Sequence, residues 1–362
     1  MSTPNHRPRR SGIRGREAVS GWLFTAPMII LLGLFLVVPV LMALWVSFSD
    51  WAGRGSPFGA NVNFVGIDNY TALLGGGGLA EQDFGTALRN NAWYVILVVP
   101  IQTGLSLFLA VLINGKILRG RGFFRTSFYF PSVTSSVAIT VLWLFLFSST
   151  GAINKLLSFI GIQGPNWFND PSGVLHNLLR LFGITEGPAA LTSGSFLGVS
   201  WWDWLAGPSV AMSAFVLMAV FTTSGTFMLL FIAALQNLSG EVTEAAIVDG
   251  ANGWQRFWQV TLPQLRPTLF TVLTLGLIGA WQVFDQIYTG TQGAPGKTTL
   301  TPAYLSYQTA FSNQAWGQGA AIAFILFVII VCFTIFQRWL LRDRPVSERR
   351  MRPYLPQSGA NR

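Results

Sequence analysis

The chain has 362 residues, of which 51% are hydrophobic and 10% are charged, whereas about a quarter of the residues in a typical soluble domain are charged. The formal net charge is +9, but the aromatic residues lie in apolar runs and not among the basic residues, which argues against a nucleic-acid-binding surface. The single Cys332 and the widely separated His6 and His176 argue against a disulfide framework and against a Cys- or His-based metal site.

Six apolar segments are long enough to cross the hydrocarbon core of a membrane, which takes about 20 helical residues. Each is predicted to be a helix, because lipid offers the backbone no hydrogen-bond partner. The segments cover roughly residues 22–48, 91–114, 127–149, 209–235, 268–289 and 318–341. We therefore expect an all-α polytopic membrane protein with a basic tail over 1–20, a membrane domain over 21–345 and a second tail over 346–362.

The first apolar segment follows a basic cluster, as the apolar region of a signal peptide would. It is longer than such a region and ends in Trp45, Phe48 and Trp51 instead of small residues. We expect an uncleaved helix.

The basic residues predict the orientation of the spans, because cytoplasmic loops are enriched in Lys and Arg. With the N-terminus inside, 18 of the 23 basic residues fall on the cytoplasmic side. The five on the outer side are Arg54, Arg89, Lys155, Arg180 and Lys297. Both termini are thus expected in the cytoplasm, where the Arg-rich tails can contact anionic lipids.

The outer loop of residues 150–208 (the 150–208 loop) is unusually long. Its apolar residues between Val174 and Phe182 recur with helical spacing. Two interpretations stay open: an amphipathic helix on the outer leaflet or against a partner, and a lid packed on this chain's own helices. Trp201, Trp202 and Trp204 lie where an outer aromatic belt is expected.

The longest inner loop, residues 237–267, has the pattern of a helix, a turn and a second helix. Ser239 is a plausible N-cap, small residues follow, and Gly250 can end the first helix. The second run, Trp254 to Val260, is aromatic, and Pro263 precedes the fifth span. Such a unit suits insertion into a groove of another protein. The alternative is an ordinary loop folded back on the helix ends.

This loop resembles the EAA loop of permease subunits of ATP-binding-cassette (ABC) importers, and we call residues 237–267 the EAA segment. The resemblance rests on its EAA triplet, its DGA triplet and its Leu-Pro pair, at family spacing. The matching residues are Glu244, Ala245, Ala246, Asp249, Gly250, Ala251, Leu262 and Pro263. FVGIDNY at 64–70, WQVFDQIY at 281–288, TQGAP at 291–295 and residues 304–311 are similar to the carbohydrate-importer branch, which includes the maltose transporter permeases.

The resemblance covers about residues 20–345 and implies a six-helix type I importer fold in a prokaryotic inner or plasma membrane. It also implies a second permease subunit, expected as a heterodimer, two cytoplasmic ATPases contacted by the eight matching residues, and an extracellular solute-binding protein. Residues of about 166–203 are an apparent insertion, and Gly293-Ala294-Pro295 replaces the usual double glycine.

The chain has no complete P-loop. Gly296-Lys297-Thr298 has the ending of one, but position 291 is Thr where the first glycine belongs, and no strand precedes it. We therefore expect no cofactor and no enzymatic activity in this chain, with ATP and Mg²⁺ bound by partner subunits. Two rival classes are a self-contained secondary transporter and a membrane enzyme with a site in the 150–208 loop.

Asp285, with Gln282 near it, is the most informative polar residue of the spans, because a carboxylate at this depth is costly unless it faces water or a partner. It either lines a solute path, accepting sugar hydroxyls, or pairs with a neighbouring helix near the outer interface. Further candidates for the path are Trp281, Phe284, Tyr288, Gln102 and Thr223. The expected solute is a mono-, di- or oligosaccharide, with glycerophosphodiesters or glycerol-phosphate-like solutes as the alternative.

Overall fold

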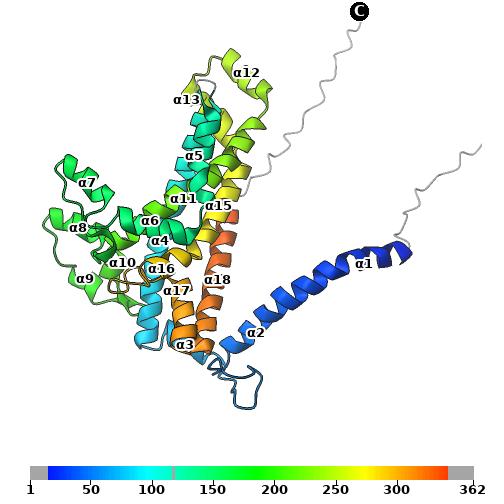
Figure 1. Ribbon diagram of the computed structural model, residues 1–362, viewed down its shortest axis with the longest axis vertical. Helices are drawn as coiled ribbons and strands as arrows, with labels where there is room; N and C mark the ends of the chain where they lie inside the picture. The colour runs from blue at the N-terminus through cyan, green and yellow to red at the C-terminus, as the bar shows by residue number, and fades with distance from the viewer. Residues whose placement is uncertain (1–14, 116–118, 341–362) are drawn as a thin grey trace, which may run out of the picture. The chain divides into compact units, whose positions relative to one another are not determined.

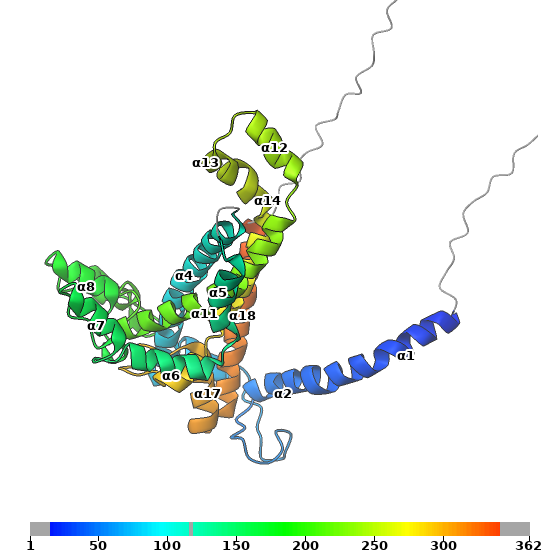
Figure 2. The same cartoon turned by 45° about the horizontal axis from the view of Figure 1, so that its top comes forward.

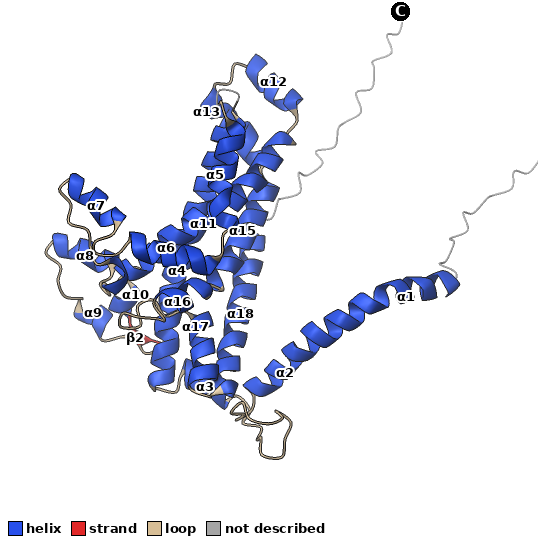
Figure 3. Cartoon of the chain, in the orientation of Figure 1, coloured by secondary structure: helices blue, strands red, loops and turns tan. Residues whose placement is uncertain are grey.

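The computed structural model describes residues 15–115 and 119–340, and its regular secondary structure is mainly helical (Figure 3). Within this part of the chain the strands are β1 (Ser195–Phe196) and β2 (Val199–Ser200), which pair antiparallel as a short hairpin. Residues 1–14 of the first predicted tail, the whole second tail over 346–362 and Lys116 lie outside the described residues.

The described residues form two compact units. The first combines residues 15–85 with 305–325, and the second combines 86–304 with 326–340. The helices that belong to the first unit, or enter it, are α1 (Gly15–Leu32), the π-helical turn η1 (Gly33–Val37), α2 (Val38–Ser47), α3 (Asp68–Leu74), α4 (Leu79–Asn114), α17 (Pro302–Tyr307), the π-helical turn η4 (Gln308–Ser312) and α18 (Trp316–Leu340).

The second unit holds most of the remaining helices around a long central one, α11 (Val210–Gln236). Before α11 the chain forms α5 (Arg121–Val133), α6 (Ser136–Leu146), α7 (Ala152–Phe159), the 3-10 turn η2 (Trp167–Asn169), α8 (Val174–Leu181), α9 (Ala189–Thr192) and α10 (Trp201–Trp204). After α11 come α12 (Gly240–Val248), α13 (Gly253–Arg256), the π-helical turn η3 (Phe257–Thr261), α14 (Leu262–Gln264), α15 (Arg266–Trp281) and α16 (Asp285–Gly290).

Five described helical segments are long and apolar enough to cross a membrane, and a bent pair makes a sixth candidate. The five are Val19–Ser47, Leu79–Asn114, Val210–Gln236, Arg266–Gly290 and Trp316–Leu340. They correspond to five of the six predicted spans. The second begins twelve residues earlier than the predicted start at 91, because the polar residues after Leu79 are helical although they are not apolar.

The third predicted span, 127–149, is wrong as a single helix. The chain there forms α5 and α6, which meet at an angle of 100°. Thr134 has an extended backbone (φ −79°, ψ 146°) and Ser135 is also non-helical, so the helix stops between two apolar stretches. The hydroxyl of Ser132 donates to the carbonyl of Thr222 on α11 at 2.6 Å, which fixes the last turn of α5.

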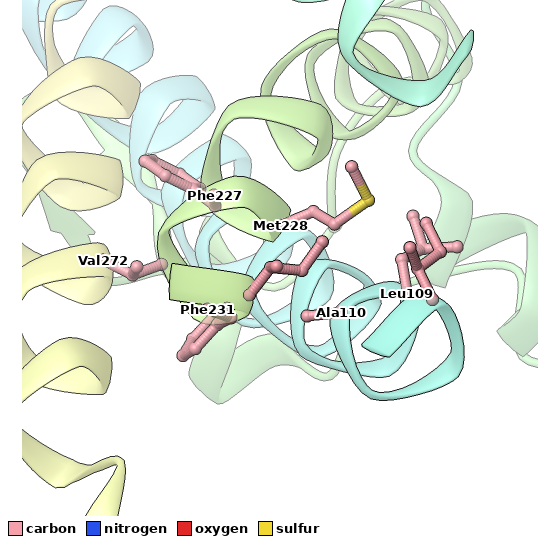
Figure 4. Close-up of a cluster of buried hydrophobic side chains, with 8 residues drawn as sticks. Leu109, Ala110, Phe227, Met228, Phe231 and Val272 are labelled. Atoms are coloured by element: carbon pink, nitrogen blue, oxygen red, sulfur yellow. The ribbon is translucent and has the colours of Figure 1, made fainter. Parts of the chain in front are cut away.

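The core of the second unit lies where α11 passes between α4 and α15. Figure 4 shows Phe227, Met228 and Phe231 of α11 packed with Leu109 of α4 and Val272 of α15. Close approach of helices, and not water exclusion, stabilises such contacts in lipid. Gly225 permits it on the α5 side, because a Cβ there would lie 2.1 Å from the carbonyl oxygen of Phe128.

The 150–208 loop is closed at its base and is bonded to the start of α11. The amide of Val174 donates to the carbonyl of Pro208 at 2.9 Å, and the amide of Val210, at the start of α11, donates to the carbonyl of Ser172 at 3.0 Å. Phe168 is buried, with its ring edge-on to Phe215 at 5.2 Å. The predicted amphipathic helix is α8, and the base of the loop packs on this chain's own helices, as the lid interpretation expects.

Candidate functional site

The EAA segment begins with α12, which ends at Asp249 in a defined motif. Gly250 has φ +80°, its amide donates to the carbonyl of Ile247 at 3.0 Å, and the amide of Ala251 donates to the carbonyl of Ala246 at 2.9 Å. These two bonds are the pair that defines a Schellman C-cap, in which a residue without a Cβ takes the left-handed conformation. The Asp-Gly-Ala sequence therefore sets the sharp turn after α12.

The second half of the EAA segment starts at once. Asn252 and Gln255 form a reciprocal capping box with two 2.9 Å hydrogen bonds at the start of α13. The helix continues through the π-helical turn η3 into α14, whose second residue is Pro263. The predicted helix, turn and helix are thus present.

The EAA segment is exposed although much of it is apolar. No residue of α12 is buried; Val248 keeps 87% of its side-chain surface exposed, and Trp254 of α13 keeps 71%. Glu244 and Ala245 are exposed, while Ala246 is half-buried, and α12 contacts η3. Figures 1 and 2 show α12 and α13 beyond the ends of α5, α11 and α15. Exposed apolar surface of this kind is characteristic of surfaces that bind another molecule.

The fifth span is also interrupted, and its break meets the break between α5 and α6. Helix α15 ends at Trp281, residues 282–284 are not helical, and α16 starts at Asp285. The hydroxyl of Ser136, the first residue of α6, donates to a carboxylate oxygen of Asp285 at 3.1 Å. Because interrupted helices are tolerated at membrane depth only where they line a cavity or are buried in protein, this meeting point is the natural place for a polar site.

A cavity of about 330 Å³ opens at this point. A second cavity of about 280 Å³ shares four of its lining residues, so the two adjoin. Their polar lining consists of Tyr94, Gln102, Ser132, Thr134, Ser136, Thr222, Thr223, Thr226, Gln282, Asp285 and Gln286. The lining thus offers one carboxylate, three amides and several hydroxyls, and it contains no Lys or Arg.

The cavity gathers five of the seven residues predicted for a solute path. Gln282, Phe284 and Asp285 line it, and so do Gln102 and Thr223, whose side chains share a hydrogen bond from the Thr223 hydroxyl to the Gln102 carbonyl oxygen at 2.5 Å.

The other two predicted residues are not among the lining. The ring of Tyr288 stacks on Phe284 at 5.5 Å, one step away from the cavity. Trp281 is buried against Phe333 at 5.4 Å. Thr134 and Ser136 line the cavity but were missed from sequence; three consecutive hydroxyl residues within an apolar segment were the available signal.

Comparison with known proteins places the chain in a family. Residues 102–344 match the family described as the binding-protein-dependent transport system inner membrane component, which is more than half of the chain. The chain belongs to this family. The expected EAA resemblance is thereby confirmed: the protein is an inner-membrane permease component of an ABC transporter, and it is not the ATPase.

Curated relatives cover nearly the whole chain. The lactose transport system permease protein LacF of Rhizobium radiobacter is 30% identical over 92% of this chain and 98% of its own length. The arabinooligosaccharides transport system permease protein AraP of Halalkalibacterium halodurans is 30% identical over 90% and 88%. The sn-glycerol-3-phosphate transport system permease protein UgpA of Agrobacterium fabrum is 31% identical over 87% and 92%.

A solved structure shares the fold. A chain of a bacterial ABC transporter involved in the import of the acidic polysaccharide alginate superposes with a TM-score of 0.66 at 20% identity, covering 90% of this chain and 97% of that one. A bacterial alginate ABC transporter in complex with an alginate pentasaccharide-bound periplasmic protein gives a TM-score of 0.67 at 19% identity. The ABC importer permease fold is therefore that of this chain.

Proposed function

We propose that this permease imports a neutral sugar, a mono-, di- or oligosaccharide, through the cavity at Asp285. The observation that carries the proposal is the lining itself: hydrogen-bonding amides and hydroxyls, one carboxylate that accepts from sugar hydroxyls, and no cation. The ring of Phe284 adds an apolar surface for the C–H face of a sugar.

A phosphorylated solute is the second candidate, because a relative is named for sn-glycerol-3-phosphate transport. A phosphate is normally received by Arg or Lys. Bringing it to a cavity whose lining holds a carboxylate and no basic residue adds repulsion in place of attraction. The composition of the lining therefore favours the neutral sugar.

The proposed mechanism is alternating access driven by partner ATPases. The exposed EAA segment sits in a groove of one ATPase subunit, with Val248 and Trp254 covered by the contact. Its rigid turn at Gly250 transmits the movement of that subunit to α11 and α15, which continue directly from the two ends of the segment and both line the cavity. The coupling arises because each nucleotide state makes different contacts with the segment.

The proposed assembly follows from this mechanism. Both termini and the EAA segment lie in the cytoplasm, and the 150–208 loop lies outside. The complex contains this chain, a different permease chain, two ATPase subunits and an external binding protein. The Arg-rich tails contact anionic lipids.

The test is uptake by proteoliposomes that contain the complete complex with its binding protein. We expect uptake of a radiolabelled neutral sugar, and no uptake of glycerol-3-phosphate. Asp285→Asn and Ser136→Ala should lower the sugar uptake rate about tenfold each, since each removes a charge-assisted hydrogen bond at the site. Ser148→Ala is the matched control, because Ser148 is a half-buried serine like Ser136 and its hydroxyl donates only to the carbonyl of Phe145 at the end of α6. Uptake of the phosphate ester, or wild-type uptake by Asp285→Asn, would overturn the assignment.

A further inference from the structure

The second unit contains a polar cavity apart from the one at Asp285. It has a volume of about 260 Å³ and lies where the 150–208 loop meets α4, the start of α11 and the loop after α16. Since a water molecule occupies about 30 Å³ of liquid, the cavity can hold one amino-acid side chain with a few waters. Its lining includes the charged residues Arg89, Arg180 and Asp203 together with His176.

The cavity has more positive than negative charge. Two guanidinium groups face one carboxylate, and Asp203 also accepts a hydrogen bond from the Ser200 hydroxyl at 2.7 Å. The guanidinium of Arg89 uses two of its nitrogens on the side-chain oxygen of Asn90, at 2.8 and 3.3 Å, and has no other hydrogen bond among the described residues. Arg180 is exposed, and the described residues give it no ion pair or hydrogen bond.

The walls of the cavity are held firmly. The side-chain amide of Asn90 donates to the carbonyls of Lys297 and Leu300, at 2.8 and 3.0 Å, and thereby ties the start of α4 to the loop after α16. On the opposite wall, the ring of His176 stacks on Trp202 with centroids 4.5 Å apart. These contacts fix the surroundings of the cavity before an anion arrives, so that the exposed Arg180 side chain is the main group to become ordered on binding.

We propose that this cavity receives an acidic side chain, Asp or Glu, of the solute-binding protein. A guanidinium recognises a carboxylate through paired, charge-assisted hydrogen bonds. Most of the cavity is built by the 150–208 loop, which the proposed topology puts outside the cell. Of the five basic residues on that side, Arg89 and Arg180 line the cavity and Lys297 is next to its lining residue Thr298. The inference rests on the proposed function for the presence of the partner and adds the chemistry of their contact.

The test titrates sugar-loaded binding protein against proteoliposomes that hold the complete complex and follows ATP hydrolysis. Arg180→Gln should raise the half-saturating concentration of binding protein about tenfold, the usual effect of losing a charge-assisted hydrogen bond. The maximal rate of ATP hydrolysis at saturation should stay at the wild-type level. Arg180→Lys should have a half-saturating concentration between those of the wild type and Arg180→Gln. High salt should bring the half-saturating concentrations of Arg180→Gln and the wild type closer together, because salt screens exposed charges.

Lys155→Gln is the matched control, since Lys155 is an exposed cation of the same loop that does not line the cavity. Equal half-saturating concentrations for Arg180→Gln and Lys155→Gln, in a complex that still imports sugar, would overturn the docking inference and leave the proposed function standing. D-glucuronate serves as the free-carboxylate probe. Suppose that D-glucuronate raised the melting temperature of the wild-type complex but not of Arg180→Gln, and that the two complexes bound the binding protein equally well. The cavity would then be a small-molecule site and the proposal would be wrong. A wild-type complex without sugar uptake would instead refute the proposed function.

Discussion

The EAA segment and the 150–208 loop flank the same helix, α11, whose 27 residues separate them by about 40 Å. The EAA segment is held by local bonds, the Schellman turn and the capping box, and leaves its apolar side chains exposed. The 150–208 loop is held by long-range bonds to α11 and by the buried ring of Phe168. The EAA segment thus leaves apolar surface uncovered by the described residues, whereas the base of the 150–208 loop packs on its own chain.

Changing Gly250 to Pro should have the largest effect on this contrast. Proline cannot take φ +80° and has no amide proton for Ile247. We expect the turn after α12 to be lost, and sugar-stimulated ATP hydrolysis by the reconstituted complex to fall to its basal rate. Gly240→Ala in the same helix is the control, because a Cβ there meets open space. If sugar still stimulated ATP hydrolysis fully in Gly250→Pro, the EAA segment would have no role in coupling.

Adjacent alanines of α12 should separate partner contact from internal packing. Ala245→Glu, on the exposed side, should lower the amount of ATPase that co-purifies about tenfold while the chain's melting temperature stays unchanged, because the added charge desolvates only in the complex. Ala246→Glu, at a half-buried position, should lower the melting temperature as well. Identical behaviour of the two variants would contradict the assignment of the two faces.

Phe168→Ala should affect the other region. Removing a buried aromatic side chain outside the lipid costs about 3–5 kcal/mol, and Phe168 packs against Phe147 and Phe215. We expect proteolysis within the 150–208 loop to become faster, with co-purification of the ATPase unchanged. Phe159→Ala, at a 77% exposed position of the same loop, should leave the proteolysis rate at the wild-type value. Equal rates for both variants would show that the loop is not anchored by this ring.

Asn252→Ala should give the smallest change. Loss of an N-cap costs about 1 kcal/mol, and here it removes the bond from the Gln255 amide to the Asn252 side chain, while the backbone amide of Asn252 can still donate to the Gln255 side chain. The expected result is about a twofold lower coupling ratio of sugar transported to ATP hydrolysed, with Asn252→Ser restoring most of it. A loss as large as that of Gly250→Pro would mean that Asn252 contacts the partner directly.

The sequence allowed the EAA segment to be predicted closely, because caps and turns are encoded by neighbouring residues. It also placed five of six spans, since apolar length suffices for a straight helix. The two helix breaks were not foreseen. Neither the break at Thr134 nor that at Gln282 contains Pro or Gly. Each is accommodated because it meets the other break and the polar cavity, where its backbone groups and hydroxyls find the polar surroundings that lipid lacks.

Contacts between distant segments, which local sequence does not reveal, also explain the outcome for the solute path. Polar residues in the spans could be selected by type, and five of seven line the cavity. Trp281 points instead to Phe333, a contact between segments more than 50 residues apart that no local pattern predicts. Sequence spacing placed Trp281 and Asp285 together, but the break between them turns their side chains to different surroundings.

The location of the EAA segment tests the account most directly. Single cysteines at Val248 and at Gln163, both exposed, would be introduced into a Cys332→Ser background and treated with a membrane-impermeant maleimide. We expect Gln163→Cys to react in intact cells, and Val248→Cys to react only from the cytoplasmic side and less when the ATPase subunits are bound. Reaction of Val248→Cys from outside intact cells would contradict the topology, the partner and the coupling together.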